Sequence, residues 1–519
     1  MQKVSVIVRF RNEATHLDAV LRAVRGQHCG VPVEVVAIDN SSIDESRAIA
    51  AQHADVVLDI AQYRPGTALN RAIESCSGDA LVILSAHAVP ANRFWLENLT
   101  SWLSNTEVLG AYGAQLYPVT SRFLDKRDLD IFSDLRPRTE ERDSDFWNAN
   151  SSFLRSSWEK EQFDESIYEL EDHYWTKKLL DGNRWVRFEP TALVYHYGHD
   201  TRNDRTFLAP STLSEADRID RAVSALTSGA EPWPTVMSAG LTLGSLSDVA
   251  EVVRAVPALG STLLEHEDFD VRWRVAAALG RIGTRTAAEF LVQGLADSSF
   301  YARDECAWAL ARLGHVGAAA LLPVVDRLDP WIKPFAALAL GLSGDPEGGR
   351  RGVRLLGASL ASGEATIVAD ALYFLGEIAG TVAVARSLTT AVLDHLAGDD
   401  TVVRAAAWCV GELARASEAN EAGTRGLVEL ARRHPLDTVR FEAVTALAKS
   451  AMANGAAQPV HEVVRALRED GAGRVRYAAM QSLRLINESG LERRAEALAH
   501  DSDSDFGVLF ERELIRRAT

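Results

Sequence analysis

Two patterns of apolar and polar residues divide the chain. In the first ~200 residues, short apolar runs alternate with stretches of helical spacing. The runs predict strands at Val4–Val8, Val33–Ile38, Val56–Leu58 and Ala80–Leu84. Strands that alternate with helices predict a mainly parallel sheet covered on both faces. Ligands of such sheets bind at the carboxyl ends of the strands, so the residues after Val8, Ile38 and Leu84 are the candidates for chemistry.

The last ~280 residues repeat a single helical pattern. Seven segments align on one apolar anchor each, with spacings of 31, 30, 35, 35, 37 and 36 residues. The anchors are Leu279, Leu310, Leu340, Leu375, Val410, Leu447 and Leu483. Each unit predicts a helical hairpin that cannot bury its apolar side alone, so the units are expected to stack into a solenoid.

Charged residues recur at fixed places in these units. A basic residue stands seven positions before five anchors, at Arg272, Arg303, Lys333, Arg440 and Arg476, and an acidic residue usually precedes it. The pattern resembles HEAT repeats, in which we expect the charges to link neighbouring repeats or cap helix ends. The fourth unit departs from the pattern, with Val368 at the basic position.

A break in the pattern separates the two halves. Gly229, Pro232 and Pro234 lie between them and predict a linker. The expected domains are therefore residues 1–225, a linker at 226–238, and an all-α solenoid at 239–519.

Charge and composition narrow the function classes. The net charge of −17 disfavours binding of nucleic acid, which needs a basic surface. The four cysteines form neither a CxxC metal site nor a disulfide framework, which favours a reducing compartment. No signal-peptide pattern and no apolar run of membrane-spanning length is present. We expect a cytoplasmic protein, with peripheral membrane contact left open.

Polar motifs follow the first two predicted strands. In VSVIVRFRNE the apolar run leads to Arg9, Asn12 and Glu13, and in VVAIDNSSIDES the second strand ends in Asp39, followed by Ser41. A carboxylate at a strand end can accept a hydrogen bond from a pyrimidine N–H. The serines and Asp44 can cap the next helix.

These motifs resemble the start of family 2 glycosyltransferases. In that family the first strand is followed by Pro-x-x-Asn-Glu and the second by Asp-(Asp/Asn)-x-Ser-x-Asp. Asn12 and Glu13 match, whereas Arg9 stands at the usual proline position. The resemblance implies a GT-A fold, an α/β Rossmann-like domain, in which these residues, Asp39 and Ser41 bind a nucleotide-sugar donor.

The third motif, GDALVILSAHAVP, departs from the family. Ser85-Ala86-His87 occupies the place of the Asp-x-Asp motif that holds a divalent ion on the donor diphosphate. Ser85 and His87 are predicted to bind the donor. Imidazole can also bind a metal, so His87 is a candidate ligand for Mn²⁺ or Mg²⁺. The alternative is that His87 only binds a phosphate or packs at the strand end.

The segment FWNANSSFLRSSWEKEQFDESIYELEDHYW resembles the acceptor-binding half of the same family. The resemblance implies that Asn148, Asn150 and Trp175 line the acceptor side. It also implies that one carboxylate of the pair Glu171 and Asp172 is the general base, and we favour Asp172. The alternative is that both acids only stabilise the start of a helix.

The last motif that resembles the family contains a histidine after a strand. In PTALVYHYGHDTRN, His196 directly follows an apolar strand, with His199 three residues further on. Similar endings in the family bring a histidine back toward the diphosphate or the metal, so His196 is the second candidate metal ligand. A surface histidine without a role is the alternative.

The sequence thus predicts an inverting glycosyltransferase with a UDP- or dTDP-sugar favoured as donor. The acceptor is expected to be a polysaccharide, glycolipid, natural product or peptide. The solenoid is expected to bind the acceptor or a protein partner, or to mediate self-association. A nucleotide-sugar-binding scaffold without catalysis is the alternative, favoured by the missing Asp-x-Asp acids.

Overall fold

The chain forms two compact units. The computed structural model describes residues 1–116, 118–119, 138–140, 146–167, 170–180, 184–197, 213–228, 231–382, 386–416, 421–454, 457–486 and 505–518. The first unit joins Met1–Phe207 to Leu467–Thr519, and the second comprises Leu208–Ala466. Both ends of the second unit are therefore connected to the first unit.

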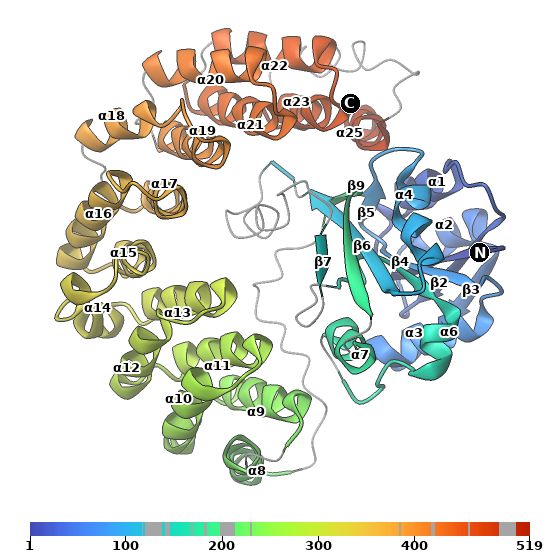
Figure 1. Cartoon of the computed structure of the whole chain (residues 1–519), viewed down its shortest axis with the longest axis horizontal. Coiled ribbons are helices and arrows are strands. Elements are labelled where there is room, and N and C mark those ends of the chain that lie inside the picture. Colours follow the sequence, from blue (N-terminus) through green and yellow to red (C-terminus); the bar gives the residue numbers. More distant parts are fainter. Residues whose placement is uncertain are drawn as a thin grey trace. The chain divides into compact units, whose positions relative to one another are not determined.

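A nine-stranded mixed sheet forms the centre of the first unit (Figure 1). The strand order is β3-β2-β1-β4-β8-β6-β9-β5, and β7 pairs with β9. The strands are β1 (Val4–Phe10), β2 (Val33–Asp39), β3 (Val56–Asp59), β4 (Ala80–Ser85), β5 (Ala88–Pro90), β6 (Val108–Leu116), β7 (Arg138–Glu140), β8 (Asn150–Leu154) and β9 (Trp185–His196).

The parallel arrangement that the sequence predicts applies to one half of this sheet. Strands β1 to β4 run parallel to one another. Strand β8 runs antiparallel to both β4 and β6, and β5 and β7 run antiparallel to β9. Because β8 reverses direction, its amino-terminal end lies at the same edge as the carboxyl ends of β1, β2 and β4.

Helices cover both faces of the sheet. They are α1 (Leu17–Arg25), α2 (Ser46–His53), α3 (Pro65–Ser75), α4 (Trp95–Thr100), α6 (Arg155–Lys160) and α7 (Glu171–Leu179). Along β1, alternate residues enter different cores: Val6 and Val8 pack with α1 and α4, whereas Ile7 packs with α3 and α7. The alternation follows from the two-residue period of a strand.

The last two described helices of the chain belong to this first unit. They are α23 (Gly473–Ile486) and α25 (Phe506–Ala518). The backbone N–H of Phe506 donates to the carbonyl of Ala91 at 2.9 Å, and the ring of Tyr477 stacks on Tyr195 with centroids 3.8 Å apart. The end of the chain therefore packs directly on the sheet domain.

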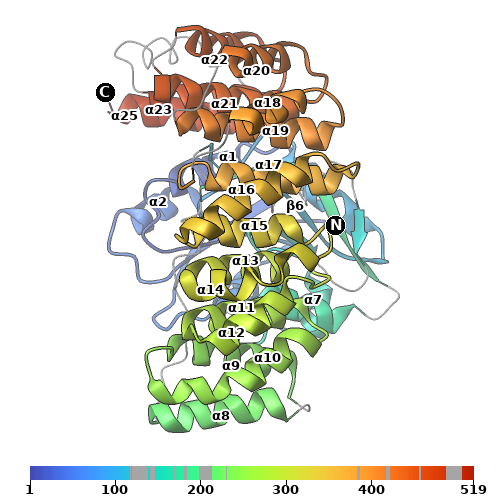
Figure 2. The ribbon, with the colours of Figure 1, turned by 90° about the vertical axis from the view of Figure 1, so that its left-hand side faces the viewer.

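The second unit is a stack of helices (Figure 2). They are α8 (Glu215–Thr227), α9 (Trp233–Ser245), α10 (Val256–Glu265), α11 (Phe269–Ile282), α12 (Arg285–Gly294), α13 (Phe300–Arg312), α14 (His315–Leu321), α15 (Lys333–Leu342), α16 (Pro346–Leu360), α17 (Ala365–Ile378), α18 (Arg386–Asp394), α19 (Asp400–Arg415), α20 (Glu421–Arg433), α21 (Asp437–Asn454) and α22 (Ala457–Glu469). Six of the predicted anchors are buried in this unit, and the seventh, Leu483, is buried in α23 of the first unit. Among the described helices, none is long and apolar enough to span a bilayer.

The recurring arginines close the turn before their own helix. Arg272 donates Nη1 to the carbonyls of His266 and Glu267, both at 2.8 Å. It also donates two hydrogen bonds to the carboxylate of Asp297, which precedes the next repeat. Arg303, Arg440 and Arg476 bind carbonyls five and six residues earlier in the same way. These charges therefore serve the solenoid structure.

The compact units divide the chain differently from the predicted domains. Helix α9 begins inside the predicted linker 226–238, because Pro232 precedes its first turn and Pro234 is its second residue, where proline is tolerated. Helix α8 lies in the helical unit, although the prediction assigned residues up to 225 to the first domain. Residues 467–519, predicted as solenoid, belong to the first unit because α23 and α25 pack on the sheet domain.

Candidate active site

Three strand ends meet at one edge of the sheet. In the register of the parallel strands, Arg9 lies beside Ser85 of β4, and Phe10 lies beside Asp39 of β2. The backbone N–H of Asn40 donates to the carbonyl of Phe10 at 2.9 Å. The structure thus brings Arg9, Asp39 and Ser85 to a common edge, as the sequence predicts.

The loops after β1 and β2 are tied to each other. The N–H of Ile43 donates to Oδ1 of Asn12 at 2.9 Å, and the N–H of Asn12 donates to Oγ of Ser42 at 3.0 Å. The N–H of Glu13 donates to Oγ of Ser46 at 2.7 Å. Ser42 and Ser46 therefore join two loops, and the side chain of Ser41 forms no cap on α2.

Backbone strain marks the same loops. Asn12 and Ser41 adopt left-handed backbone conformations, with φ of 54° and 55°. Such conformations cost free energy in residues other than glycine and persist where the surroundings impose them. Asp39 is buried, and its Oδ1 accepts a hydrogen bond from the N–H of Ser42 at 2.9 Å. The loop after β2 is therefore rigidly held.

A cluster of histidines surrounds Glu13. Nδ1 of His87 lies 2.9 Å from one carboxylate oxygen, and Nδ1 of His16 lies 3.5 Å from the other. Burial opposes ionisation of Glu13, but the hydrogen bonds from His16 and His87 outweigh it and lower the pKa of Glu13 to about 2. His16, which the sequence did not single out, thus belongs to the site; its place three residues after Glu13 is the only sequence signal.

His196 joins this cluster through strand pairing. Ala88 of β5 lies beside His196 of β9, so the rings of His87 and His196 approach to 4.8 Å between centroids. Burial, followed by the effect of His87, lowers the pKa of His196 well below its ordinary value, which keeps the imidazole neutral. His199, three residues further on, lies outside the described residues.

The donor atoms of this cluster limit what metal it can hold. Within the described part of the chain, no three His, Cys, Asp or Glu side chains form a group of metal ligands. Both oxygens of Glu13 face imidazoles, which leaves His87 and His196 as nitrogen ligands. Mg²⁺ and Mn²⁺ prefer oxygen ligands. The two histidines alone therefore do not form a complete site for either ion.

A buried carboxylate pair opens helix α7. Glu171 and Asp172 are only 6% and 8% exposed. Nη1 of Arg9 forms an ion pair with Oε1 of Glu171 at 3.0 Å, so the end of β1 and the start of α7 are joined. Burial opposes the charge of Arg9, but Tyr63 and Glu171 raise the pKa of Arg9 above its ordinary value. The cation at the usual proline position thus neutralises one acid of the pair.

Asp172 differs from Glu171 in its partners. Its two oxygens accept hydrogen bonds from the backbone N–H groups of Asn148, at 2.7 Å, and His173, at 3.0 Å. Burial and the neighbouring charge of Glu171 raise the pKa of Asp172 from 3.8 to about 6. Just before the pair, Leu170 has a left-handed backbone with φ of 59°. Asp172 is therefore a fixed carboxylate that is ionised at neutral pH and more basic than an ordinary aspartate.

Two of the predicted acceptor residues do not line the site. Asn150 is fully buried and bonds to the indole N–H of Trp95 and the carbonyls of Ala114 and Ala192. Trp175 is 1% exposed and packs in the aromatic core beneath the sheet. Because both side chains are enclosed by the core, neither can contact an acceptor. Asn148 is also buried, at 2% exposed, but it differs from the other two because its Nδ2 approaches Glu171 of the carboxylate pair at 3.4 Å.

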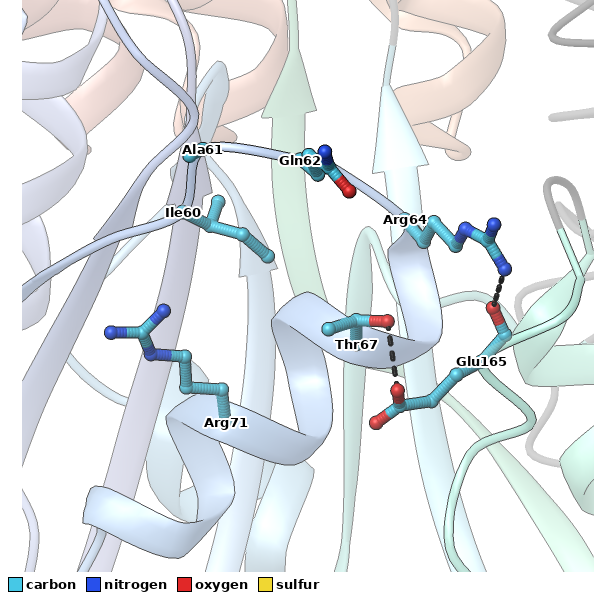
Figure 3. A pocket seen from close by; sticks show the side chains of 7 residues that line it. All are labelled: Ile60, Ala61, Gln62, Arg64, Thr67, Arg71 and Glu165. Carbon is cyan, nitrogen blue, oxygen red and sulfur yellow. Dashed lines mark hydrogen bonds between the residues drawn. The ribbon is translucent and has the colours of Figure 1, made fainter. Parts of the chain in front are cut away.

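A surface pocket of about 460 Å³ adjoins the site (Figure 3). It is lined by Ile60, Ala61, Gln62, Arg64, Thr67, Arg71 and Glu165. The N–H of Ile60 donates to the carbonyl of Asp39, so one wall of the pocket continues from the strand end at Asp39. Glu165 closes the other side by accepting hydrogen bonds from Arg64 and Thr67, both at 3.1 Å. Tyr63 lies between two lining residues in sequence but interacts with Arg9 and Glu171.

Family models match a part of each half of the chain. The model of glycosyl transferase family 2 matches residues 5–160, which include the strand ends at Arg9, Asp39 and Ser85, called the donor edge from here on. The model of HEAT repeats matches residues 219–311 and 256–328. The chain carries a family 2 glycosyltransferase domain followed by HEAT repeats. The predicted class of enzyme, its GT-A fold and its repeat region are thereby confirmed.

Solved structures similar to this transferase include two sugar transferases. The mannosyltransferase PcManGT from Pyrobaculum calidifontis, in complex with GDP-Man and Mn²⁺, is 19% identical, with 62% of this chain and 87% of that chain covered and a TM-score of 0.34. Glucosyl-3-phosphoglycerate synthase from Mycobacterium tuberculosis, in complex with Mn²⁺, UDP and its product, is 16% identical, with 39% and 74% covered and a TM-score of 0.29.

A curated relative matches a short part of the chain. Deoxyhypusine hydroxylase of Gallus gallus is 35% identical over 96 residues, which are 18% of this chain. The match spans 32% of that protein. It therefore carries no activity over to the transferase.

Proposed function

We propose that this transferase moves a sugar from a UDP- or dTDP-sugar to a nucleophile of the acceptor with inversion of the anomeric carbon. The observation that carries the proposal is the ion pair between Arg9 and Glu171. It joins the strand edge with Asp39 and Ser85 to the start of α7 with Asp172. A donor-binding edge and a basic carboxylate therefore belong to one site.

The donor is assigned to the loops after β1, β2 and β4. Asp39 stands at a strand end, where a carboxylate accepts a hydrogen bond from a pyrimidine N–H. The two loops that contain Asn12 and Ser41 already have their strained conformations without a ligand. This order reduces the conformational entropy that is lost when the donor binds. Ser85 and His87, at the neighbouring strand end, are assigned to the diphosphate.

The general base is assigned to Asp172. A single displacement requires a carboxylate that takes the proton of the acceptor while the acceptor attacks from the face opposite the diphosphate. With a pKa of about 6, Asp172 is ionised at pH 7 and closer to the working pH than an ordinary aspartate. Glu171 is held by Arg9, so its role is to raise the basicity of Asp172 and to fix the start of α7.

Neutralisation of the leaving diphosphate is assigned to the histidine cluster. His87 and His196 would hold a divalent ion only together with oxygens of the donor itself, because the described residues offer no third ligand. When bound, such an ion supplies positive charge to the departing diphosphate. Glu13 orients His87 through Nδ1.

The helical unit is assigned to the acceptor or to a protein partner. Solenoids of helical repeats present extended surfaces to other macromolecules. The proposed acceptors are a polysaccharide, a glycolipid, a natural product or a peptide. Hydrogen exchange with an accepted substrate checks this assignment: slower exchange is expected in helices α9–α22, and slower exchange confined to residues 1–197 would contradict it.

The stereochemistry of the product tests the reaction. Purified protein is supplied with UDP-glucose, dTDP-glucose or GDP-mannose, and the configuration of the released or transferred sugar is followed by NMR at early times. An α-linked donor is expected to give a β-configured product. A product of retained configuration would refute Asp172 as the base of a single displacement. If none of the donors is turned over or bound, the non-catalytic scaffold becomes the better account.

A further inference from the structure

The end of strand β9 is held by the last helices of the chain. The hydroxyl of Tyr195 donates to Oδ2 of Asp505 at 2.7 Å, and the ring of Tyr195 stacks on Tyr477. Oδ1 of Asp505 accepts a hydrogen bond from the N–H of Val508 in the first turn of α25. This contact joins residues that lie 310 positions apart in the sequence. It fixes α25 against the strand that carries His196.

A second contact leads from α25 toward the donor edge. The carboxylate of Glu511 is completely buried and accepts hydrogen bonds from Tyr197 Oη at 2.9 Å, Gln481 Nε2 at 3.1 Å and Arg484 Nε at 2.9 Å. A buried charge is tolerated only when it is well paired, so this geometry is strongly constrained. Burial and Glu511 keep the pKa of Tyr197 well above its ordinary value, so its hydroxyl remains a donor.

The other side of Tyr197 contacts both histidines that bind Glu13. Its ring stacks on the ring of His16, with centroids 5.2 Å apart and an interplanar angle of 24°. Its backbone N–H donates to the carbonyl of His87 at 2.8 Å. Each of these histidines faces one oxygen of Glu13. Tyr197 therefore lies between Glu511 and the histidine cluster.

We propose that helix α25 is a positioning element of the transferase site, which acts through Glu511 and Tyr197 on His16 and His87. The inference rests on the proposed function, because it assumes that His87 binds the donor. Tyr197 fixes the backbone of His87 and the ring of His16, and these in turn fix Glu13. The end of a chain whose middle forms the HEAT repeats thus sets the geometry of the donor edge.

A matched pair of tyrosine variants separates positioning from plain stability. Tyr197→Phe and Tyr195→Phe each remove one hydroxyl that donates to a buried carboxylate of the C-terminal segment. Of these two tyrosines, Tyr197 is the one that contacts His16 and His87. Loss of one such hydrogen bond is expected to lower the melting temperature of both full-length variants.

The readout is the dissociation constant of a nucleoside diphosphate, measured by calorimetry with UDP and GDP as probes. Tyr197→Phe is expected to weaken binding about fivefold, because His16 and His87 are then held less firmly in the geometry that binds the donor, whereas Tyr195→Phe stays within about twofold of the wild type. Equal dissociation constants for the two variants would overturn the positioning role.

A third variant keeps the inference distinct from the proposed function. His87→Ala is measured in parallel and is expected to weaken diphosphate binding more than Tyr197→Phe. If His87→Ala weakens binding while the two tyrosine variants behave alike, only the role of α25 is overturned. If none of the three variants changes binding, the donor role of His87 and the positioning by α25 are both overturned.

Discussion

The two units of the protein differ in the residue types that adopt a positive φ. Among the described residues, the non-glycine residues with positive φ are Asn12, Ser41 and Leu170, and all three lie beside the candidate active site. In the helical repeats, positive φ occurs at Gly283, Gly314, Gly344 and Gly398, where it costs little. The repeats thus avoid strain with glycine, whereas the site retains residues with side chains despite it. This contrast is expected where function selects the side chain.

Buried charges show the same contrast. In the repeats, Arg272 pairs with Asp297 and Lys449 pairs with Glu412, and both pairs join neighbouring repeats. At the site, Arg9 pairs with Glu171 but a second carboxylate, Asp172, lies next to them in sequence and has a raised pKa. In these two repeat pairs each acid faces a cation, whereas the site holds a second acid, Asp172, next to its ion pair.

Removal of this second acid should have the largest effect on turnover. Asp172→Asn is expected to lower kcat about 10²- to 10⁴-fold, because only the general base is lost. Its matched control in the repeats is Asp297→Asn, which breaks a structural pair. This control is expected to lose stability in urea unfolding and to keep kcat. The contrast fails if Asp297→Asn lowers kcat as much as Asp172→Asn does.

Removal of the cation tests the pair itself. Arg9→Met leaves Glu171 without its partner and is expected to cost about 3 kcal/mol of unfolding free energy. Lys449→Met in the repeats is expected to cost a similar amount. Only Arg9→Met should also lower kcat, since loss of the cation favours protonated carboxylates at the start of α7. Unfolding in urea and kcat at pH 7 check both points, and an unchanged kcat in Arg9→Met would contradict the account.

The acid limb of the pH profile sharpens the assignment of the base. Because the pKa of Asp172 is raised to about 6, kcat should fall as the pH decreases through this value and level off above it. Glu171→Gln removes a negative neighbour that raises this pKa, so the limb should move to lower pH. A limb that stays in place would mean that another group limits turnover.

The smallest effects concern the backbone. Gly283→Ala places a side chain at φ of 77° and is expected to cost about 1–2 kcal/mol of stability. Ser41→Gly relieves strain at φ of 55° but frees the unfolded chain, so stability should change by less than about 1 kcal/mol. Only Ser41→Gly is expected to weaken nucleotide binding. Calorimetry with UDP checks this difference, and equal affinity for the wild type and Ser41→Gly would show that Ser41 is dispensable.

Local patterns predicted the features that depend on neighbours in sequence. The apolar runs predicted strands β1 to β4, and the anchor spacing predicted the repeats, because both follow from the period of buried residues. Asp39 and Ser85 could be placed at one edge because parallel strands share their carboxyl ends. The structural role of the recurring arginines also followed from their constant position, seven residues before the anchor of their unit.

Contacts between distant segments could not be predicted in this way. Arg9 and Glu171 are 162 residues apart, and Tyr197 and Glu511 are 314 residues apart, so no local pattern joins them. The prediction that Asn150 and Trp175 contact the acceptor rested on residue type. A hydrogen-bonded amide or an indole occurs equally well in a buried core. The return of α25 to the sheet domain was missed because its partners there, such as Tyr197, lie about 300 residues earlier in the sequence.

Nucleotide binding tests the central claim most directly. Calorimetry is carried out on the wild type, Asp39→Asn and Asp172→Asn with UDP, dTDP and GDP, each with and without Mn²⁺. A pyrimidine diphosphate is expected to bind the wild type and Asp172→Asn equally and Asp39→Asn more weakly, and a gain with Mn²⁺ would show that the diphosphate binds together with an ion. If none of the diphosphates binds the wild type, the assignment of this edge to a nucleotide-sugar donor is wrong.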